Sequence, residues 1–282
     1  MLVSFVLGKG DDFKTMSEVC LENGFASENY TITTEDGYIL DLYRIPGQAS
    51  EEAGNQPKPA VLLQHGIDCD MMMWIFNSPD KANAFILSRA GYDVWIGNNR
   101  GTTYGMRHQS LDPKERPFWN FYQEDMARKD LPAFIDFILE TTGLETISFI
   151  GHSQGTTQFM LGASLEPDYY TPKINLAILM APVALPANVC GIVNRTAYYI
   201  DEIVDVVVDI GKHYNWIPYS PNTSESIDEQ CERIFERELC RALLDIFVDE
   251  SVMNTSRFHA ALTWLPAGSG WRTWVYYYQM IA

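Results

Sequence analysis

The chain has 282 residues, of which 46% are hydrophobic and 20% are charged, a composition typical of a globular protein with a large buried core. Its formal net charge is −17, and it contains no basic cluster that could hold a phosphate backbone, which argues against nucleic acid as a partner. No stretch approaches the roughly 20 apolar residues that a membrane span requires, so we expect no transmembrane segment and only peripheral contact with a membrane.

The chain opens with a predicted β-hairpin. Residues 30–34 and 38–43 are strand-like runs on either side of Glu35-Asp36-Gly37, and the Asp-Gly pair supplies the positive φ that a tight hairpin needs. Two short apolar runs follow, at residues 60–63 and 92–96, with a predicted helix over residues 82–90 between them. Both runs resemble buried parallel strands, and we expect the loops at their carboxyl ends to carry function.

Helices and strands then alternate. A helix is predicted over residues 126–139, followed by a strand over 146–150, a helix over 156–165 and a strand over 176–180. This order predicts a parallel sheet with helices on both faces. Gly143 is placed to cap the first of these helices. The apolar face of that helix consists of Leu131, Phe134, Ile135 and Ile138.

The pattern changes after Pro182. Helical segments are predicted over residues 200–210 and 227–248, separated by Trp216 and a Pro-containing stretch. We therefore divide the chain into a core over residues 1–183, a helical cap over 184–254 and a return to the core over 255–282. A cap of this kind can gate a lipid site or can simply pack on the sheet, and the sequence does not separate these outcomes.

Residues Gly151-His152-Ser153-Gln154-Gly155 follow the apolar strand at 146–150 and open the helix at 156–165. A G-x-S-x-G pentapeptide between a strand and a helix is the layout of a nucleophile elbow, in which a strained turn exposes the serine Oγ. Ser153 is therefore the candidate nucleophile. The alternative interpretation is a tightly packed glycine-rich connection that does no chemistry.

Several further segments occur in a fixed order around this pentapeptide. They are the hairpin Thr34 to Leu40, Gln64-His65-Gly66-Ile67, Gly91 to Gly101, Trp119 to Ala133, Gly151 to Thr157, Asn254 to Arg257 and Leu265 to Gly268. Together they resemble the acid lipase family, the α/β-hydrolases that include lysosomal acid lipase and gastric lipase. The resemblance runs from about Tyr30 to Gly268. It implies a doubly wound, mostly parallel α/β-hydrolase sheet with an inserted helical cap, from which the family's C-terminal strands are missing.

The resemblance implies hydrolysis of hydrophobic carboxylic esters, such as acylglycerols or steryl esters at a membrane or droplet surface, without a metal or organic cofactor. Ser153 would form an acyl-enzyme, and the backbone N–H groups of Gln154 and Ile67 would stabilise the oxyanion. The spacing of Cys231 and Cys240 resembles that of the family's cap disulfide. Cys20, Cys69 and Cys190 have no assigned partner.

Four Asn-x-Ser/Thr sequons are compatible with passage through a secretory pathway and with a lysosome-like or secreted destination. The candidate glycosylation sites are Asn29, Asn194, Asn222 and Asn254.

The acid and base of a catalytic triad have no matching positions in this chain. Hydrolases of this fold place them after the serine, in the order Asp or Glu and then His, yet residues 269–282 contain neither type. Asp249 and His259 lie in the predicted connection from cap to core, and we interpret them as structural. The remaining histidines are interpreted as follows: His65 holds a turn, His152 packs beside the oxyanion loop, and His108 and His213 lie on the surface or in the cap.

Without a base a serine is a poor nucleophile, so the chain as given is expected to be nearly inactive. Three hypotheses therefore stay open. The first is a lipid ester hydrolase. The second is a lipid-binding homologue without turnover, or an inactive fragment that lacks the triad Asp and His. The third is a hydrolase of another acyl bond, such as a thioester or an amide, because a nucleophile elbow indicates transfer of an acyl group but does not identify the leaving group.

Overall fold

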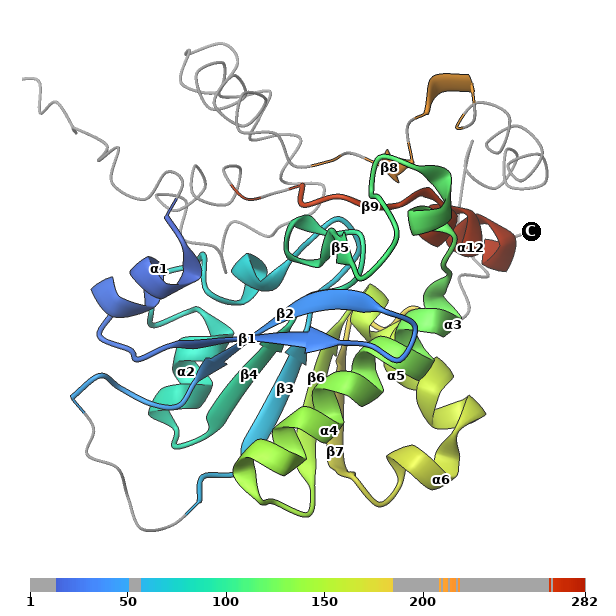
Figure 1. The fold of residues 1–282 in the computed structure, drawn as a ribbon. Helices are drawn as coiled ribbons and strands as arrows, with labels where there is room; N and C mark the ends of the chain where they lie inside the picture. Colours follow the sequence, from blue (N-terminus) through green and yellow to red (C-terminus); the bar gives the residue numbers. More distant parts are fainter. Residues whose placement is uncertain are drawn as a thin grey trace, which may run out of the picture.

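A mixed β-sheet runs through the middle of the molecule (Figure 1). The computed structural model describes residues 14–50, 57–184, 208, 210–212, 214–216, 218, 264 and 266–281. Within them the strand order of the seven-stranded sheet is β1-β2-β4-β3-β6-β7, with β5 also paired to β2. The strands are β1 (Glu28–Thr33), β2 (Tyr38–Ile45), β3 (Ala60–Gln64), β4 (Asp93–Gly97), β5 (Arg107–His108), β6 (Ile147–His152) and β7 (Ile174–Met180).

The predicted hairpin and the predicted parallel strands are both present. β1 and β2 pair antiparallel around a turn in which Gly37 has a φ of +93°, a conformation that favours glycine. Strands β4, β3, β6 and β7 are mutually parallel, and β2 joins β4 antiparallel. The carboxyl ends of the four parallel strands therefore meet at one edge of the sheet, which is where α/β folds place their functional loops.

Helices cover both faces of the sheet (Figure 1). Side chains alternate along each strand, so Leu62 packs into one apolar cluster with α4 and α6, while Val61 and Leu63 pack into a second cluster with α1 and α2. The α-helices are α1 (Met16–Glu22), α2 (Asn83–Arg89), α3 (Gln123–Asp125), α4 (Leu131–Thr142), α5 (Gln154–Leu165), α6 (Pro167–Tyr170) and α12 (Trp271–Ile281), and the 3-10 turns are η1 (Met71–Trp74), η2 (Thr103–Gly105) and η3 (Arg116–Trp119). The predicted doubly wound α/β arrangement is confirmed.

In the helix predicted over residues 126–139, the first turn is not α-helical. Residues Met126–Asp130 form a π-helical turn, η4, in which the N–H of Leu131 donates to the carbonyl of Met126 five residues back. Pro132 follows directly and has no N–H to give to an α-helical partner, which accounts for the wider turn at this point. From Leu131 the α-helix continues as predicted, its four apolar residues are buried, and Gly143 ends it with a φ of +69°.

Strand β7 lies at the edge of the described sheet, and one of its faces is open. Leu176, Ile178 and Met180 alternate along this face and are 54%, 43% and 37% exposed. On the other edge of the sheet, β1 carries exposed polar side chains instead. The two edge strands of the described sheet therefore differ in the side chains that they expose: those of β7 are apolar and those of β1 are polar. Strand β7 pairs with β6, the strand that leads into the elbow.

The last described segment crosses the carboxyl edge of the sheet. Strand β9 (Ser269–Gly270) pairs with β8 (Asn215–Trp216), and α12 follows it. The predicted cap over residues 184–254 lies almost entirely outside the described residues, as do Cys190, Cys231, Cys240, His213, Asp249 and His259. Across the residues that are described, no helix combines the length and apolar character that crossing a bilayer would require.

A buried ionic network joins the hairpin to the loop after β4. Arg100 is fully buried, donates to both Asp130 (2.6 Å) and Asp36 (2.7 Å), and lies 3.9 Å from the ring centre of Tyr38. A buried guanidinium is tolerated only when it is paired in this way, because the cost of its desolvation is otherwise not offset. The network fixes the start of the β4 loop, which is one of the loops predicted to carry function.

Candidate active site

The predicted elbow lies at the junction of β6 and α5. Ser153 is the residue between the two elements and has φ 48° and ψ −110°, a conformation that L-residues adopt only under constraint. Its N–H donates to the carbonyl of Met180 on β7 at 3.0 Å. The serine is half-buried, and its Oγ makes no hydrogen bond to any described residue. The strained turn thus holds the hydroxyl in the geometry expected of a nucleophile elbow.

The two glycines of the pentapeptide are required by close packing. A Cβ on residue 151 would lie 2.8 Å from the carbonyl carbon of Gly155, and a Cβ on residue 155 would lie 2.5 Å from the carbonyl oxygen of Gln64. Both separations are far below van der Waals contact. The start of α5 can therefore approach the ends of β6 and β3 only when both positions lack a side chain.

The loop after β3, residues His65-Gly66-Ile67, is the predicted oxyanion loop and lies directly against the serine. A Cβ on Gly66 would be 3.3 Å from the Cβ of Ser153, so this loop and the elbow are in contact. Neither the N–H of Ile67, which follows Gly66, nor that of Gln154 donates to another described residue. Gln154 is also the first residue of α5, where the helix dipole favours negative charge. Two backbone donors beside one serine match the predicted oxyanion hole, and their role stays a prediction.

Two histidines flank this site and have structural contacts. His65 is fully buried; its Nδ1 lies 2.8 Å from the carbonyl oxygen of Gly66, and its Nε2 accepts the N–H of Asn99 at 3.0 Å. Burial lowers the pKa of His65 to about 4, so the ring is neutral at physiological pH. His65 therefore holds the turn, as expected.

His152 packs beside the oxyanion loop, also as expected. Its Nδ1 would lie 3.0 Å from a Cβ on Gly66, and burial lowers the pKa of its ring. His108, expected at the surface or in the cap, is a half-buried residue of β5; its Nε2 lies 2.8 Å from the carbonyl oxygen of Asp36, and its Nδ1 accepts the N–H groups of Ser110 and Leu111. That histidine therefore braces the hairpin turn and lies away from the elbow.

Amide side chains fill the space behind the elbow. The Oδ1 of Asn99 accepts from Gln64 Nε2 at 2.6 Å and from Gln158 Nε2 at 2.8 Å, and Gln158 Nε2 also lies 3.0 Å from the sulfur of Met126. All three amides are buried. They tie the end of β3 and the β4 loop to the second turn of α5, so the helix that carries Ser153 at its start is fixed to two neighbouring strands.

Three acidic or thiol side chains in the loop after Ile67 were not singled out from the sequence as site residues. Burial raises the pKa of Asp68 to about 6, although hydrogen bonds from Ser269 and Trp274 oppose the shift. Burial also raises the pKa of Asp70 to about 7. Cys69, between them, is a free thiol, as is Cys20 in α1. Because Asp68 and Asp70 closely follow Ile67, their position beside the predicted oxyanion loop could have been recognised from the sequence alone.

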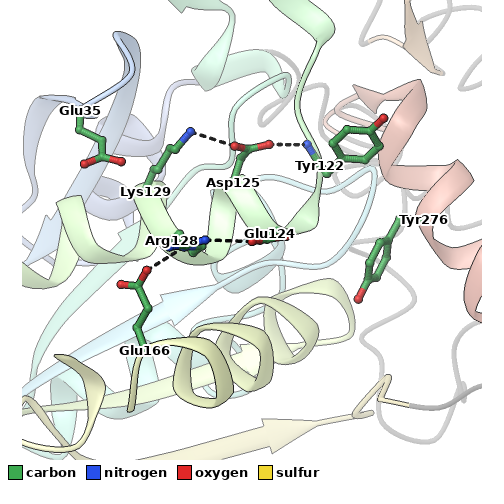
Figure 2. Close-up of a pocket in the computed structure, with 8 residues that line it drawn as sticks. All are labelled: Glu35, Tyr122, Glu124, Asp125, Arg128, Lys129, Glu166 and Tyr276. Atoms are coloured by element: carbon green, nitrogen blue, oxygen red, sulfur yellow. Dashed lines mark hydrogen bonds and ion pairs between the residues drawn. The ribbon is translucent and has the colours of Figure 1, made fainter. Parts of the chain in front are cut away.

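A cavity of about 740 Å³ lies elsewhere, between the hairpin turn, α3, η4 and α12 (Figure 2). Its two cationic side chains are each paired: Arg128 with Glu124 and Glu166, and Lys129 with Asp125. The cavity contains none of the predicted site residues. Because its positive charges are already neutralised and it has no nucleophile, it is a poor candidate for either anion binding or acyl transfer. Its lining residues are Glu35, Tyr122, Glu124, Asp125, Arg128, Lys129, Glu166 and Tyr276.

Two family models match the chain. The model described as alpha/beta hydrolase fold matches residues 59–204, and the one described as a partial alpha/beta-hydrolase lipase region matches residues 16–78. The first match includes the elbow, and both include the oxyanion loop.

Individual proteins agree with these models. Human (Homo sapiens) lysosomal acid lipase/cholesteryl ester hydrolase is 34% identical over 94% of this chain and 66% of its own length. Human gastric triacylglycerol lipase is 36% identical over 87% of this chain and 61% of its own length. A crystal structure of a protein from Sulfolobus solfataricus shares the fold at 16% identity, with a TM-score of 0.65 over 90% of this chain and 75% of that one. The chain thus spans about two thirds of the length of the curated relatives it matches.

We expect Gly155→Ala to destabilise the protein by on the order of 1–3 kcal/mol or more, because the added Cβ would overlap the backbone carbonyl of Gln64, which cannot move aside. Gly143→Ala is the comparison: it introduces strain at a positive φ, but nothing lies within 4 Å of its added Cβ. Chemical denaturation of both variants measures the difference. Equal losses in the two variants would contradict the packing argument.

Asp70 gives a prediction about pH. Its pKa is raised to about 7 by burial, so the folded state favours the neutral carboxyl; this contribution to stability is complete below pH 4 and is lost as the pH rises through 7. Asparagine is neutral throughout and keeps an oxygen to accept the N–H of Met72. The free energy of unfolding of Asp70→Asn, relative to the original protein, should therefore increase between pH 4 and pH 7.5 by on the order of 2–4 kcal/mol. A difference that does not change with pH, measured by denaturation at several pH values, would show that the argument is wrong.

Proposed function

Because the chain belongs to the α/β-hydrolase family and, within it, to the acid lipases, we propose that it is a serine hydrolase of hydrophobic carboxylic esters. One observation carries the proposal: Ser153 occupies a strained elbow beside two backbone N–H groups that have no acceptor among the described residues. The substrate class, acylglycerols or steryl esters, follows the names of the relatives, which are a cholesteryl ester hydrolase and a triacylglycerol lipase.

In the proposed reaction the Oγ of Ser153 attacks the ester carbonyl carbon, and the electron pair of the C=O bond moves to the oxygen. The N–H groups of Gln154 and Ile67 donate to that oxyanion, and one such donor typically lowers the barrier by about 2.7–4 kcal/mol. Collapse of the tetrahedral intermediate expels the alcohol and leaves an acyl-serine, which water then hydrolyses. A base must take the serine proton. Among the described residues none forms a hydrogen bond with the Oγ of Ser153, so the proposal assigns the nucleophile and the two oxyanion donors.

The first experiment treats the protein, purified from its natural source or expressed from its complete gene, with a fluorophosphonate probe. We expect covalent labelling of Ser153, and Ser153→Ala should abolish labelling and lower turnover of a long-chain ester by on the order of 10³-fold or more. Ser148→Ala, on the same strand β6, is the matched control and should keep both activities, because its hydroxyl donates to Asn175.

Other outcomes separate the alternatives. Labelling of a different residue, or turnover that survives Ser153→Ala, would contradict the assignment of the nucleophile. Binding of a long-chain ester with neither labelling nor turnover would favour a lipid-binding homologue. A thioester hydrolysed much faster than the matching ester would favour another acyl bond.

We also propose a lysosome-like or extracellular location, supported by the relatives named a lysosomal acid lipase and a gastric lipase. Asn29 is exposed on the edge strand β1, where a glycan could be attached without disturbing the core, while Asn194, Asn222 and Asn254 lie outside the described residues. Mass spectrometry of the natural protein before and after N-glycan removal should show a glycan on Asn29. An unmodified Asn29 in protein recovered from the cytosol would count against this location.

A further inference from the structure

Helix α12 extends from one side of the elbow to the other. The Nε1 of Trp274 donates to Asp68 at 3.4 Å, and Asp68 directly follows Ile67 of the oxyanion loop. The OH of Tyr277 donates to the Oγ1 of Thr157 at 3.2 Å, and Thr157 lies one helical turn after Ser153. Trp274 and Tyr277 are three residues apart and share a face of α12. This face therefore spans from the oxyanion loop to the first turn of α5, with Ser153 between its two contacts.

The same face is aromatic and only partly buried. Tyr278, four residues after Trp274, completes it, and all three side chains retain some exposure. By contrast, Trp271 and Val275, on a neighbouring face of α12, are buried in the main apolar cluster. The helix is thus attached to the core on one face, while its aromatic contacts with Asp68 and Thr157 lie on another.

The carboxylate of Asp68 fixes the beginning of this helix. In addition to Trp274, its Oδ1 accepts from the Oγ of Ser269 at 2.5 Å, and its backbone carbonyl accepts the N–H of Ala267 at 2.7 Å. Asp68 itself has a φ of +54°, which is uncommon for a residue other than glycine. These contacts bind the oxyanion loop and the start of α12 together.

An acyl chain attached to Ser153 has to leave the elbow along one of the surfaces that flank it. We propose that it lies along the Trp274–Tyr277–Tyr278 face of α12, which forms one wall of an acyl-chain site, and that Asp68 is the positioning residue for this wall. The inference rests on the proposed ester hydrolase function and specifies the subsite that selects long aliphatic chains. Apolar side chains along the path of an alkyl chain favour longer chains, because each added methylene leaves water.

Tyr276 provides a matched control. It is the same residue type as its neighbour on the same helix, but it lines the charged cavity on the α3 side (Figure 2). Its ring packs edge-on against that of Tyr277, with 5.8 Å between the ring centroids, but its removal leaves Trp274 and the hydrogen bond from Trp274 to Asp68 in place. Any effect of helix destabilisation alone should therefore appear equally in Tyr276→Ala and in Trp274→Ala.

The test compares kcat/KM for p-nitrophenyl palmitate and p-nitrophenyl butyrate in the natural protein. We expect Trp274→Ala to lower the palmitate-to-butyrate ratio by about tenfold or more, and Tyr276→Ala to leave it within about twofold. Asp68→Ala should lower the ratio as Trp274→Ala does, while Asp68→Asn, which keeps an oxygen acceptor for Trp274 and Ser269, should largely restore it. An unchanged ratio with both rates reduced equally would overturn the proposal and leave α12 a structural element.

Binding of cis-parinaric acid, a fluorescent fatty acid, to the same variants gives a second measurement that does not depend on turnover. Weaker binding in Trp274→Ala than in Tyr276→Ala supports the wall even when no ester is hydrolysed, and equal binding overturns it. Absence of turnover with intact, Trp274-dependent binding would therefore count against the proposed function and not against the acyl site.

Discussion

Residue 155 has no room for a side chain, and the rest of the site depends on this constraint. The carbonyl oxygen of Gln64 occupies the place where a Cβ would be, so α5 starts in direct backbone contact with the end of β3. Gly151 allows the same approach from β6. The sharp turn between strand and helix leaves Ser153 in its strained conformation and places it against Gly66, so the candidate nucleophile and the predicted oxyanion loop are brought together by backbone packing and not by side-chain contacts.

Polar chemistry is concentrated at one edge of an otherwise apolar sheet. The middles of β3 and β4 are buried on both faces, whereas the residues just beyond their carboxyl ends are amides, a histidine, an arginine and two carboxylates. Each has a defined role in holding a loop: His65 holds its own turn, Asn99 joins three elements, and Arg100 reaches the hairpin. The loop that presents the N–H group of Ile67 is in this way fixed by its neighbours.

The parts of the fold that could be predicted are those encoded locally. The Asp-Gly turn, the short β-branched runs and the pentapeptide each contain their own signal, and they led to the hairpin, the parallel strands and the elbow. The π-helical turn at Met126–Asp130 was missed because the helical pattern over residues 126–139 continues through Pro132, its cause, without a break. The contact between Asp68 and Trp274 could not be read from the sequence either, since 206 residues separate the two and neither carries a motif.

That separation has a consequence for how the chain is assembled during synthesis. The strand pairings of the sheet and the backbone hydrogen bond that holds the elbow all lie between residues 28 and 180, so these contacts can form before the rest of the chain is translated. The partners of Asp68, which are Ala267, Ser269 and Trp274, lie some 200 residues after it and are translated only about 90 residues after Met180. Closing so long a loop is slow compared with local folding. In the nascent chain, Ser153 should therefore adopt its strained conformation before the segment with Ala267, Ser269 and Trp274 has been translated. During this interval the elbow would be formed but not yet covered by that segment.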